Sequence, residues 1–328
     1  MKEDDIRPRD LLIENSDLLE EDIENILMHR EGFVTIDCPA CESRDYNFLF
    51  DKKGFFFVKC RYCETVFTNP RPTKKLLANY YATSKCYEHY NSCLFPATEK
   101  SRREIFKYRT LKIAEVCKKY DVPREKIIDV GAGFGTFCEC ISDLSIFKSV
   151  IAIEPSSSLA KTCRKKGITV VEKLVEDVFL EDVSMITCFE LIEHLYCPKD
   201  FILSCTRLLA NGGFLYLTTP NIKGFDMMVL GKHNDNIIAP NHLNFFNIQS
   251  CIYLLMQCGL EPIEVTTPGL LDVELVVKKV ESGEFNLDDQ SFLKEVICSG
   301  IEGRREVFQK FLSENLLSSH MSILAKKK

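Results

Sequence analysis

The sequence lacks any apolar run of the ~18–20 residues that a membrane-spanning helix requires, which argues against membrane insertion. Residues 1–5 are acidic and lead into no apolar signal region, so we expect a cytoplasmic rather than a secreted protein. An excess of positive charge is also absent. The formal net charge of −6 argues against broad binding to nucleic acid or to anionic membranes.

The composition is otherwise that of an ordinary globular protein. The 328 residues suffice for one large domain and a smaller module, and 45% of them are hydrophobic. Sixteen cysteines without an export signal favour reduced thiols or metal ligands over disulfides. Many of these cysteines lie in apolar stretches and are expected to be small buried hydrophobes: Cys138, Cys140, Cys188, Cys205, Cys251 and Cys258.

Four other cysteines form two C-x2-C pairs, Cys38 with Cys41 and Cys60 with Cys63, separated by eighteen residues. This doubled pair predicts a structural zinc site with four thiolate ligands and no open coordination position. The phenylalanine-rich segment 48–59 between the pairs predicts a β-hairpin that turns at Gly54, which is the layout of a zinc ribbon. A redox C-x-x-C pair is the alternative, but no βαβ pattern surrounds these cysteines.

Two nucleotide-binding fingerprints are missing from the glycine-rich segment 127–135. The dinucleotide pattern requires glycine where the chain has Thr136, and no Gly-Lys-Ser/Thr follows. The segment reads D-x-G-x-G-x-G at a predicted strand-to-helix turn, where ligands bind in open α/β sheets. Glycines there let the backbone approach a ligand closely, although an ordinary glycine-rich turn is the alternative.

This pattern resembles the first motif of class I S-adenosylmethionine-dependent methyltransferases. The resemblance implies that an acid holds the ammonium of the methyl donor and that loop N–H groups meet its carboxylate. The residues it assigns to this part of the donor site are Asp129, Gly131, Ala132, Gly133, Phe134 and Gly135.

Two further acids complete the expected donor site. Glu154 ends the second predicted strand, where a carboxylate can accept hydrogen bonds from a ribose diol, or alternatively caps a helix before Pro155. After the third strand, Asp177 suits the adenine amino group, with Glu176 as a competitor, and Val178 is expected to pack on the ring.

Beyond residue 126, strand-like and helical segments alternate, which predicts an α/β fold: a mostly parallel, Rossmann-like sheet with helices on both faces. The predicted strands are 126–130, 149–154, 168–171, 183–189, 213–219, 262–267 and 320–325. The predicted domains are an N-terminal helical segment (1–32, with helical spacing over 6–30), the ribbon (33–72), a helical linker or lid (73–125) and the methyltransferase domain (126–328). The last contains a helical insertion at about 272–318, expected over the sheet edge. The lid carries a tyrosine patch: Tyr80, Tyr81, Tyr87 and Tyr90.

The resemblance extends over 126–326. Segments 189–195, 207–213 and 218–221 look like later motifs of the class. The ribbon followed by Asn69-Pro70-Arg71-Pro72 resembles a subset associated with bacterial cell-surface polysaccharide or modified-sugar biosynthesis.

The acceptor side is expected around Glu190, Glu193 and His194, which have the spacing of one helical face, together with the distal His242. This set is similar to the E-x-x-E-H motif and distal histidine of small-RNA 2′-O-methyltransferases, where it binds a divalent ion, and ubiquinone-pathway O-methyltransferases show a related motif. Mg²⁺ or Mn²⁺ would orient and acidify a substrate hydroxyl. Alternatively, Glu190 lies near the sulfonium and His194 or His242 is a general base without metal.

The expected function is methyl transfer from S-adenosylmethionine to a hydroxyl of a small molecule: a sugar, nucleotide-sugar or glycan. Two alternatives stay open. One is an enzyme like the RNA 2′-O-methyltransferases, which the acidic net charge disfavours, and the other is a non-catalytic zinc-ribbon adaptor.

Overall fold

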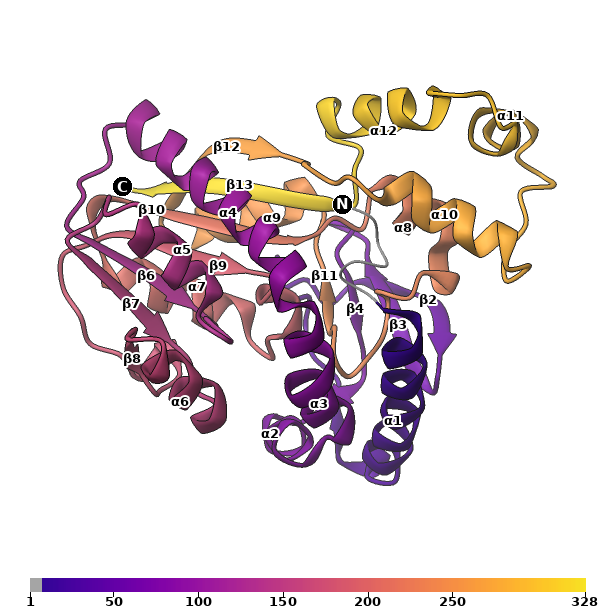
Figure 1. The fold of residues 1–328 in the computed structure, drawn as a ribbon. Coiled ribbons are helices and arrows are strands. Elements are labelled where there is room, and N and C mark those ends of the chain that lie inside the picture. Colours follow the sequence, from indigo (N-terminus) through magenta and orange to yellow (C-terminus); the bar gives the residue numbers. More distant parts are fainter. Residues whose placement is uncertain (1–7) are drawn as a thin grey trace.

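The computed structural model describes residues 8–328, so the expectations for residues 1–7 lie outside the described part. Within the predicted N-terminal helical segment, one helix forms, α1 (Arg9–Leu27). It lies beside the smaller sheet and the short helices α2 and α3, at the side of the molecule away from the large sheet (Figure 1).

The large sheet has seven strands in the order β12-β13-β10-β9-β6-β7-β8. Five neighbouring strands, β10 to β8 in that order, are parallel, whereas β13 is antiparallel to both β10 and β12. The predicted α/β class is confirmed, and the strands agree with the predicted ones to within a few residues. Their bounds are β6 (Lys126–Val130), β7 (Ser149–Ile153), β8 (Thr169–Val171), β9 (Val183–Phe189), β10 (Leu209–Pro220), β12 (Leu260–Thr266) and β13 (His320–Lys327).

Helices cover both faces of this sheet because successive strand residues point to opposite sides. Ile127 packs against α4 and α5, whereas its neighbour Ile128 belongs to the cluster on the other face, with α7 and α9. Met185 and Ile186 divide in the same way. These helices are α4 (Phe95–Lys119), α5 (Thr136–Asp143), α7 (Pro198–Leu208) and α9 (Ile248–Gln257), and α6 (Ser157–Lys165) connects β7 to β8.

A second sheet contains the predicted hairpin. Its order is β11-β4-β3-β2, formed by β2 (Tyr46–Lys52), β3 (Phe55–Cys60), β4 (Val66–Thr68) and β11 (Asn244–Phe245). The hairpin turns at Lys53 and Gly54, both with positive φ. Strand β11 comes from the large C-terminal part of the chain, and the pair β1 (Phe33–Val34) with β5 (Arg71–Pro72) lies alongside. The 33–72 segment therefore does not stand apart from 126–328 in the structure.

The 73–125 segment is helical, as predicted, and comprises α2 (Lys74–Thr83), α3 (Lys85–His89), a π-helical turn (Tyr90–Leu94) and α4. Side chains fix where the short helices begin: Thr73 accepts a hydrogen bond from the N–H of Leu76, and Ser84 accepts one from the N–H of Tyr87. The Ser84 hydroxyl also donates to the Asp22 carboxylate at 2.6 Å, which ties α3 to α1.

The 272–318 insertion forms three helices, α10 (Asp272–Glu281), α11 (Ser291–Cys298) and α12 (Arg304–Glu314). They pack against α8 (Phe225–Leu230) and one another around a separate apolar cluster that includes Leu230, Val276 and Ile297. In Figure 1 these helices extend to one side of β12 and β13, and α12 contacts the end of the edge strand β12 through the hydrogen bond from the Thr267 hydroxyl to the Ser313 carbonyl. No helix within residues 8–328 is long and apolar enough to cross a membrane.

Candidate functional site

The glycine loop runs from the end of β6 to the start of α5, as the sequence predicts. Gly133 and Gly135 have φ values of 55° and 71°. A side chain on Gly135 would collide with Ile168 and Cys163, whereas no atom lies within 4 Å of the position that a Cβ on Gly133 would occupy. The absence of a side chain at Gly135 therefore lets the loop pack against Ile168 and Cys163. At Gly133 the absence of a side chain leaves open space beside the backbone.

Glu154 reaches this loop from the end of β7. Its Oε2 accepts a hydrogen bond from the N–H of Gly133 and its Oε1 accepts one from the N–H of Ser156, both at 2.9 Å. Burial raises the pKa of Glu154, and the two backbone donors oppose that shift. Each carboxylate oxygen keeps further acceptor capacity, so the group can still accept from a ligand hydroxyl.

Asp129 lies beneath the loop, with only 4% of its surface exposed. Its Oδ1 accepts a hydrogen bond from the Thr187 hydroxyl at 2.8 Å. Burial raises the pKa of Asp129 to about 7, against the opposing effects of Thr187 and the Arg109 charge. A cationic ligand group nearby would favour the ionised form of this carboxyl.

The remaining residues of the loop contact neighbouring elements. The N–H of Ala132 donates to the Ile153 carbonyl at 3.3 Å, next to a stronger bond from Gly131. The Phe134 ring stacks on Phe95 with centroids 3.7 Å apart and planes 3° from parallel. The first residue of α4 thus contacts the glycine loop.

The residues predicted at the adenine position have different surroundings. Val175–Asp177 forms a 3-10 turn in which Asp177 and its predicted competitor Glu176 are exposed. Val178 is buried in the sheet core, with 3% of its surface exposed.

On the acceptor side, the structure brings Glu193, His194 and His242 together, with one ligand atom of each lying within 4.8 Å of the others. The two imidazole rings meet edge to face, with centroids 4.6 Å apart. His194 Nδ1 lies 2.7 Å from the Asn241 carbonyl oxygen, and His242 Nδ1 lies 2.6 Å from that of Asn236. A carbonyl only accepts, so the Nδ1 atom of each ring carries a proton, which leaves Nε2 as the atom that faces other groups.

Glu193 is 1% exposed and accepts a hydrogen bond from the Thr219 hydroxyl at 2.9 Å. Burial, followed by the neighbouring Glu190 carboxylate, raises the pKa of Glu193 well above its usual value. Burial and the second imidazole lower the pKa of His194 to about 3. The set therefore offers two imidazoles, of which His194 is held neutral, and a carboxyl group that needs a positive partner to ionise.

Glu190 is not part of this set, contrary to the expected single helical face. Its φ of 50° places it in a bend, and the 3-10 turn begins only at Ile192. Glu190 accepts from the Thr218 hydroxyl at 2.5 Å and lies 3.5 Å from Arg109 and 3.4 Å from His320. Arg109 and His320 were not expected at the site, because they lie in a helix and at a strand start far away in sequence.

The tyrosine patch lies beside this cluster. The Tyr81 ring makes edge-to-face contacts with the rings of both Tyr80 and Tyr87. The Tyr80 hydroxyl donates to the Asn241 side chain at 2.5 Å, next to the carbonyl that holds His194. Helix α2 therefore contacts the loop that carries His242.

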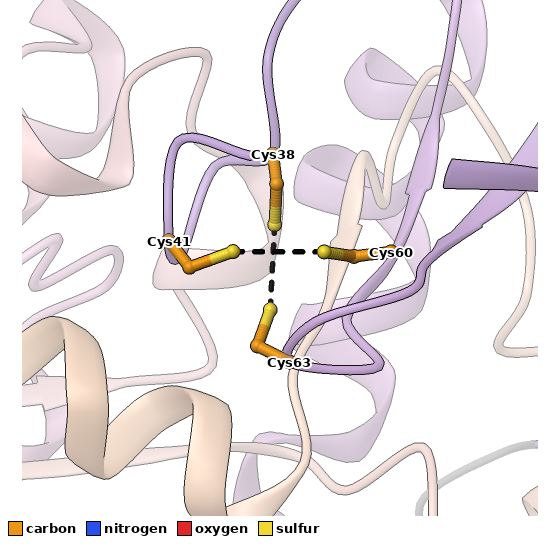
Figure 2. Close-up of side chains that lie close together, drawn as sticks. All are labelled: Cys38, Cys41, Cys60 and Cys63. Carbon is orange, nitrogen blue, oxygen red and sulfur yellow. Dashed lines mark hydrogen bonds between the residues drawn. The ribbon is translucent and has the colours of Figure 1, made fainter. Parts of the chain in front are cut away.

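The four predicted cysteine ligands converge as expected, with all four sulfur atoms within 4.8 Å of one another. Figure 2 shows the two loop pairs facing each other, with Cys38 opposite Cys63 and Cys41 opposite Cys60, each at 3.5 Å. All sixteen cysteines are free of disulfides, and the six expected to be small buried hydrophobes are buried. Four thiols at this spacing match the ligand set of a tetrahedral structural zinc site.

Comparison with known proteins gives a consistent result. A family model described as a methyltransferase domain matches residues 99–265, about half of the chain. Two relatives are each named ubiquinone biosynthesis O-methyltransferase. That of Methylococcus capsulatus is 29% identical over 117 residues, which cover 32% of this chain and 48% of that protein. That of a Xanthomonas oryzae strain is 32% identical over 115 residues, which cover 32% of this chain and 47% of that protein.

The chain thus spans about half the length of these relatives. Among solved structures, an S-adenosylmethionine-dependent methyltransferase from Archaeoglobus fulgidus aligns at 17% identity. The alignment covers 72% of this chain and all of that one, with a TM-score of 0.48.

Proposed function

Because the chain belongs to the methyltransferase domain family, we propose that it transfers a methyl group from S-adenosylmethionine to a hydroxyl of a small molecule. One observation carries this proposal. The backbone at Gly133 borders open space and is held by Glu154, at the carboxyl edge of a parallel sheet where ligands of such folds bind.

The donor site fits the chemistry of S-adenosylmethionine. The open side of Gly133 admits the aminoacyl end against the backbone, and Asp129 lies below with a carboxyl group that an ammonium would ionise. Glu154 supplies the acceptor oxygens for the ribose diol. We propose Val178 and Asp177 as the adenine contacts, although the exposure of Asp177 makes it the less constrained of the two.

The acceptor site is proposed at Glu193, His194 and His242. A histidine that ligates a metal characteristically donates its second ring N–H to an oxygen, and both imidazoles have this arrangement. The hydroxyl of Thr219 orients the Glu193 carboxylate in the same way. Two imidazoles and a carboxylate suit Mn²⁺ or a similar divalent ion, which when bound lowers the pKa of an acceptor hydroxyl. Glu190, held by Thr218 and Arg109, belongs to the wall of the donor pocket, near the sulfonium.

For the reaction itself, the acceptor oxygen attacks the methyl carbon while the carbon–sulfur bond breaks and its electron pair stays on sulfur. The residues of this chain hold the acceptor oxygen, the methyl carbon and the sulfur of the donor in line. Helix α4 and the tyrosine patch exclude water from the reacting atoms. Alignment of this kind supplies on the order of 7–11 kcal/mol of a reaction barrier. The proton of the acceptor hydroxyl leaves to the Nε2 atom of an imidazole or to solvent.

The four cysteines are proposed to bind one structural zinc ion. For the acceptor, the relatives' names point to ubiquinone biosynthesis, whereas the ribbon resembles enzymes of sugar biosynthesis. We propose a sugar, nucleotide-sugar or glycan hydroxyl as the first class to examine, with ubiquinone precursors as the comparison.

The test is a mass-spectrometric assay for transfer of a deuterated methyl group from S-adenosylmethionine to both acceptor classes, with and without chelator and added Mn²⁺. We expect a product 17 mass units heavier (CD₃ replacing H) with one class, and at least about a 100-fold loss of rate in Glu193→Ala and His242→Ala. Retention of chelator-insensitive activity in both variants would rule out the metal and leave the general-base alternative.

A further inference from the structure

Arg71 is a fully buried arginine, with 0% of its surface exposed, whose hydrogen-bond acceptors are all neutral oxygen atoms. Its guanidinium donates to three carbonyl oxygens, those of Thr68, Tyr196 and Leu243, and to the amide oxygen of Asn244, at 2.9–3.2 Å. Burial lowers the pKa of Arg71 to about 10. A buried charge is costly, and here no carboxylate among these partners offsets that cost.

The acceptors of Arg71 lie in the two segments that carry the proposed acceptor site. Tyr196 follows His194 by two residues, and Leu243 directly follows His242. One planar group from β5 therefore holds both segments at fixed distances from the ribbon. Because a guanidinium presents its donors in a rigid fork, the bonds fix orientation as well as distance.

The same segments are joined by a second layer of hydrogen bonds. The N–H of Leu243 donates to the Glu193 carbonyl at 2.8 Å, and the Thr68 N–H donates to the Leu243 carbonyl at 3.0 Å. The Asn244 side chain, oriented by Arg71, donates to the Leu195 carbonyl at 2.7 Å. These contacts connect β4 of the ribbon to the backbone on both sides of the cluster.

The cluster of four cysteines (Cys38, Cys41, Cys60 and Cys63) is continuous with this network. Strand β4 begins three residues after Cys63, and it pairs through Val66 and Phe67 with β11. The Cys63 carbonyl accepts a hydrogen bond from the Asn247 side chain at 2.8 Å, two residues beyond β11. The ribbon therefore contacts the His242 loop along the whole of β11.

We propose that Arg71 is a positioning residue for the site formed by Glu193, His194 and His242, and that the ribbon serves to hold this site rather than to bind a partner. The proposal rests on the proposed function for the meaning of that site. Arg71 touches neither donor nor acceptor. It acts through Leu243 and Asn244 on His242, and through Tyr196 on the segment that carries Glu193 and His194.

The test compares Arg71→Lys with wild type and with Val276→Ala, a control in α10 that removes fully buried apolar volume far from the site. Lysine keeps the positive charge, but its single ammonium group cannot donate hydrogen bonds to all four acceptor oxygens. The first readout is the ring nitrogen spectrum of ¹⁵N-histidine-labelled full-length protein without added metal. We expect the His194 and His242 signals to move in Arg71→Lys, while His29 and His233 stay in place. Val276→Ala should leave the His194 and His242 signals unmoved.

The second readout is Mn²⁺ binding by calorimetry. We expect affinity to fall about 10–100-fold in Arg71→Lys, as for other groups that orient metal ligands, with S-adenosylmethionine affinity unchanged within about twofold. Asn244→Asp keeps the oxygen that accepts from Arg71 but loses the N–H that donates to the Leu195 carbonyl. We expect the same loss of Mn²⁺ affinity and the same movement of the histidine signals in this variant. It replaces Arg71→Lys if Arg71→Lys fails to fold.

Unmoved His194 and His242 signals in both variants would overturn the proposal. Absence of Mn²⁺ binding in wild type would instead contradict the metal in the proposed function, and the histidine spectrum would still decide the role of Arg71. Equal signal changes in Val276→Ala would show a general loss of stability and would also overturn the proposal.

Discussion

At the scale of single residues, Asp226 combines complete burial with a carboxyl oxygen, Oδ1, that has no hydrogen-bond partner within residues 8–328. Its other oxygen accepts from the Asn234 side chain at 2.8 Å. Burial and the neighbouring Asp272 carboxylate raise the pKa of Asp226 to about 7. The folded protein thus favours the protonated form of Asp226.

This shift predicts a pH dependence of stability. A raised carboxyl pKa adds stability below the unfolded value near 4, and that stability is lost as the pH rises through 7. Between pH 5 and pH 8 the free energy of unfolding of wild type should therefore fall relative to Asp226→Asn, by a few kcal/mol at most, at about 1.4 kcal/mol per pKa unit. Urea unfolding at both pH values measures this difference.

Asp289→Asn, which changes an exposed aspartate of the 272–318 insertion that packs against α8, is the control and should follow wild type. A constant difference between wild type and Asp226→Asn across this range would show that Asp226 is ionised throughout.

At the scale of elements, the ribbon and the large domain depend on each other through β4 and β11. A two-residue strand such as β11 has little stability alone, so its pairing with β4 needs the ribbon to be folded. A structural metal contributes directly to the folding free energy of a small module with little core of its own. Loss of the zinc ion proposed for the four cysteines should therefore disturb β11 as well as β2 to β4.

The prediction is one zinc ion per chain in protein purified without added metal, and its loss in Cys60→Ser. Atomic emission spectroscopy measures the zinc content, and thermal unfolding should show a Tm lower by several degrees, at about 2–4 °C per kcal/mol for domains of 150–250 residues. Cys117→Ser, which alters a buried cysteine of α4 outside the four-cysteine cluster, is the control variant that should keep its zinc. Zinc-free wild type with unchanged stability in Cys60→Ser would contradict the structural role.

At the scale of the whole molecule, the sequence predicts local features well and long-range ones poorly. The strands, the glycine loop and the cysteine pairs follow from periodicity and spacing within short windows. The pairing of β4 with β11 and three of the four hydrogen bonds from Arg71 join segments more than a hundred residues apart, and no short pattern encodes them. Glu190 departs from the expected helical face because its positive φ delays the turn until Ile192.

We propose that the glycine loop binds S-adenosylmethionine, and calorimetric titration with this compound measures that binding. The matched pair is Gly133→Ala and Gly167→Ala, since both glycines have positive φ and no atom within 4 Å of an added Cβ. Both variants carry a similar backbone strain, but only the methyl at 133 would occupy the proposed donor site.

We predict saturable binding to wild type and Gly167→Ala, no binding of NAD, and an affinity at least about tenfold weaker in Gly133→Ala, equivalent to about 1.4 kcal/mol. Absence of binding to wild type, with or without Mn²⁺, would rule out the proposed donor site and favour a non-catalytic zinc-ribbon adaptor.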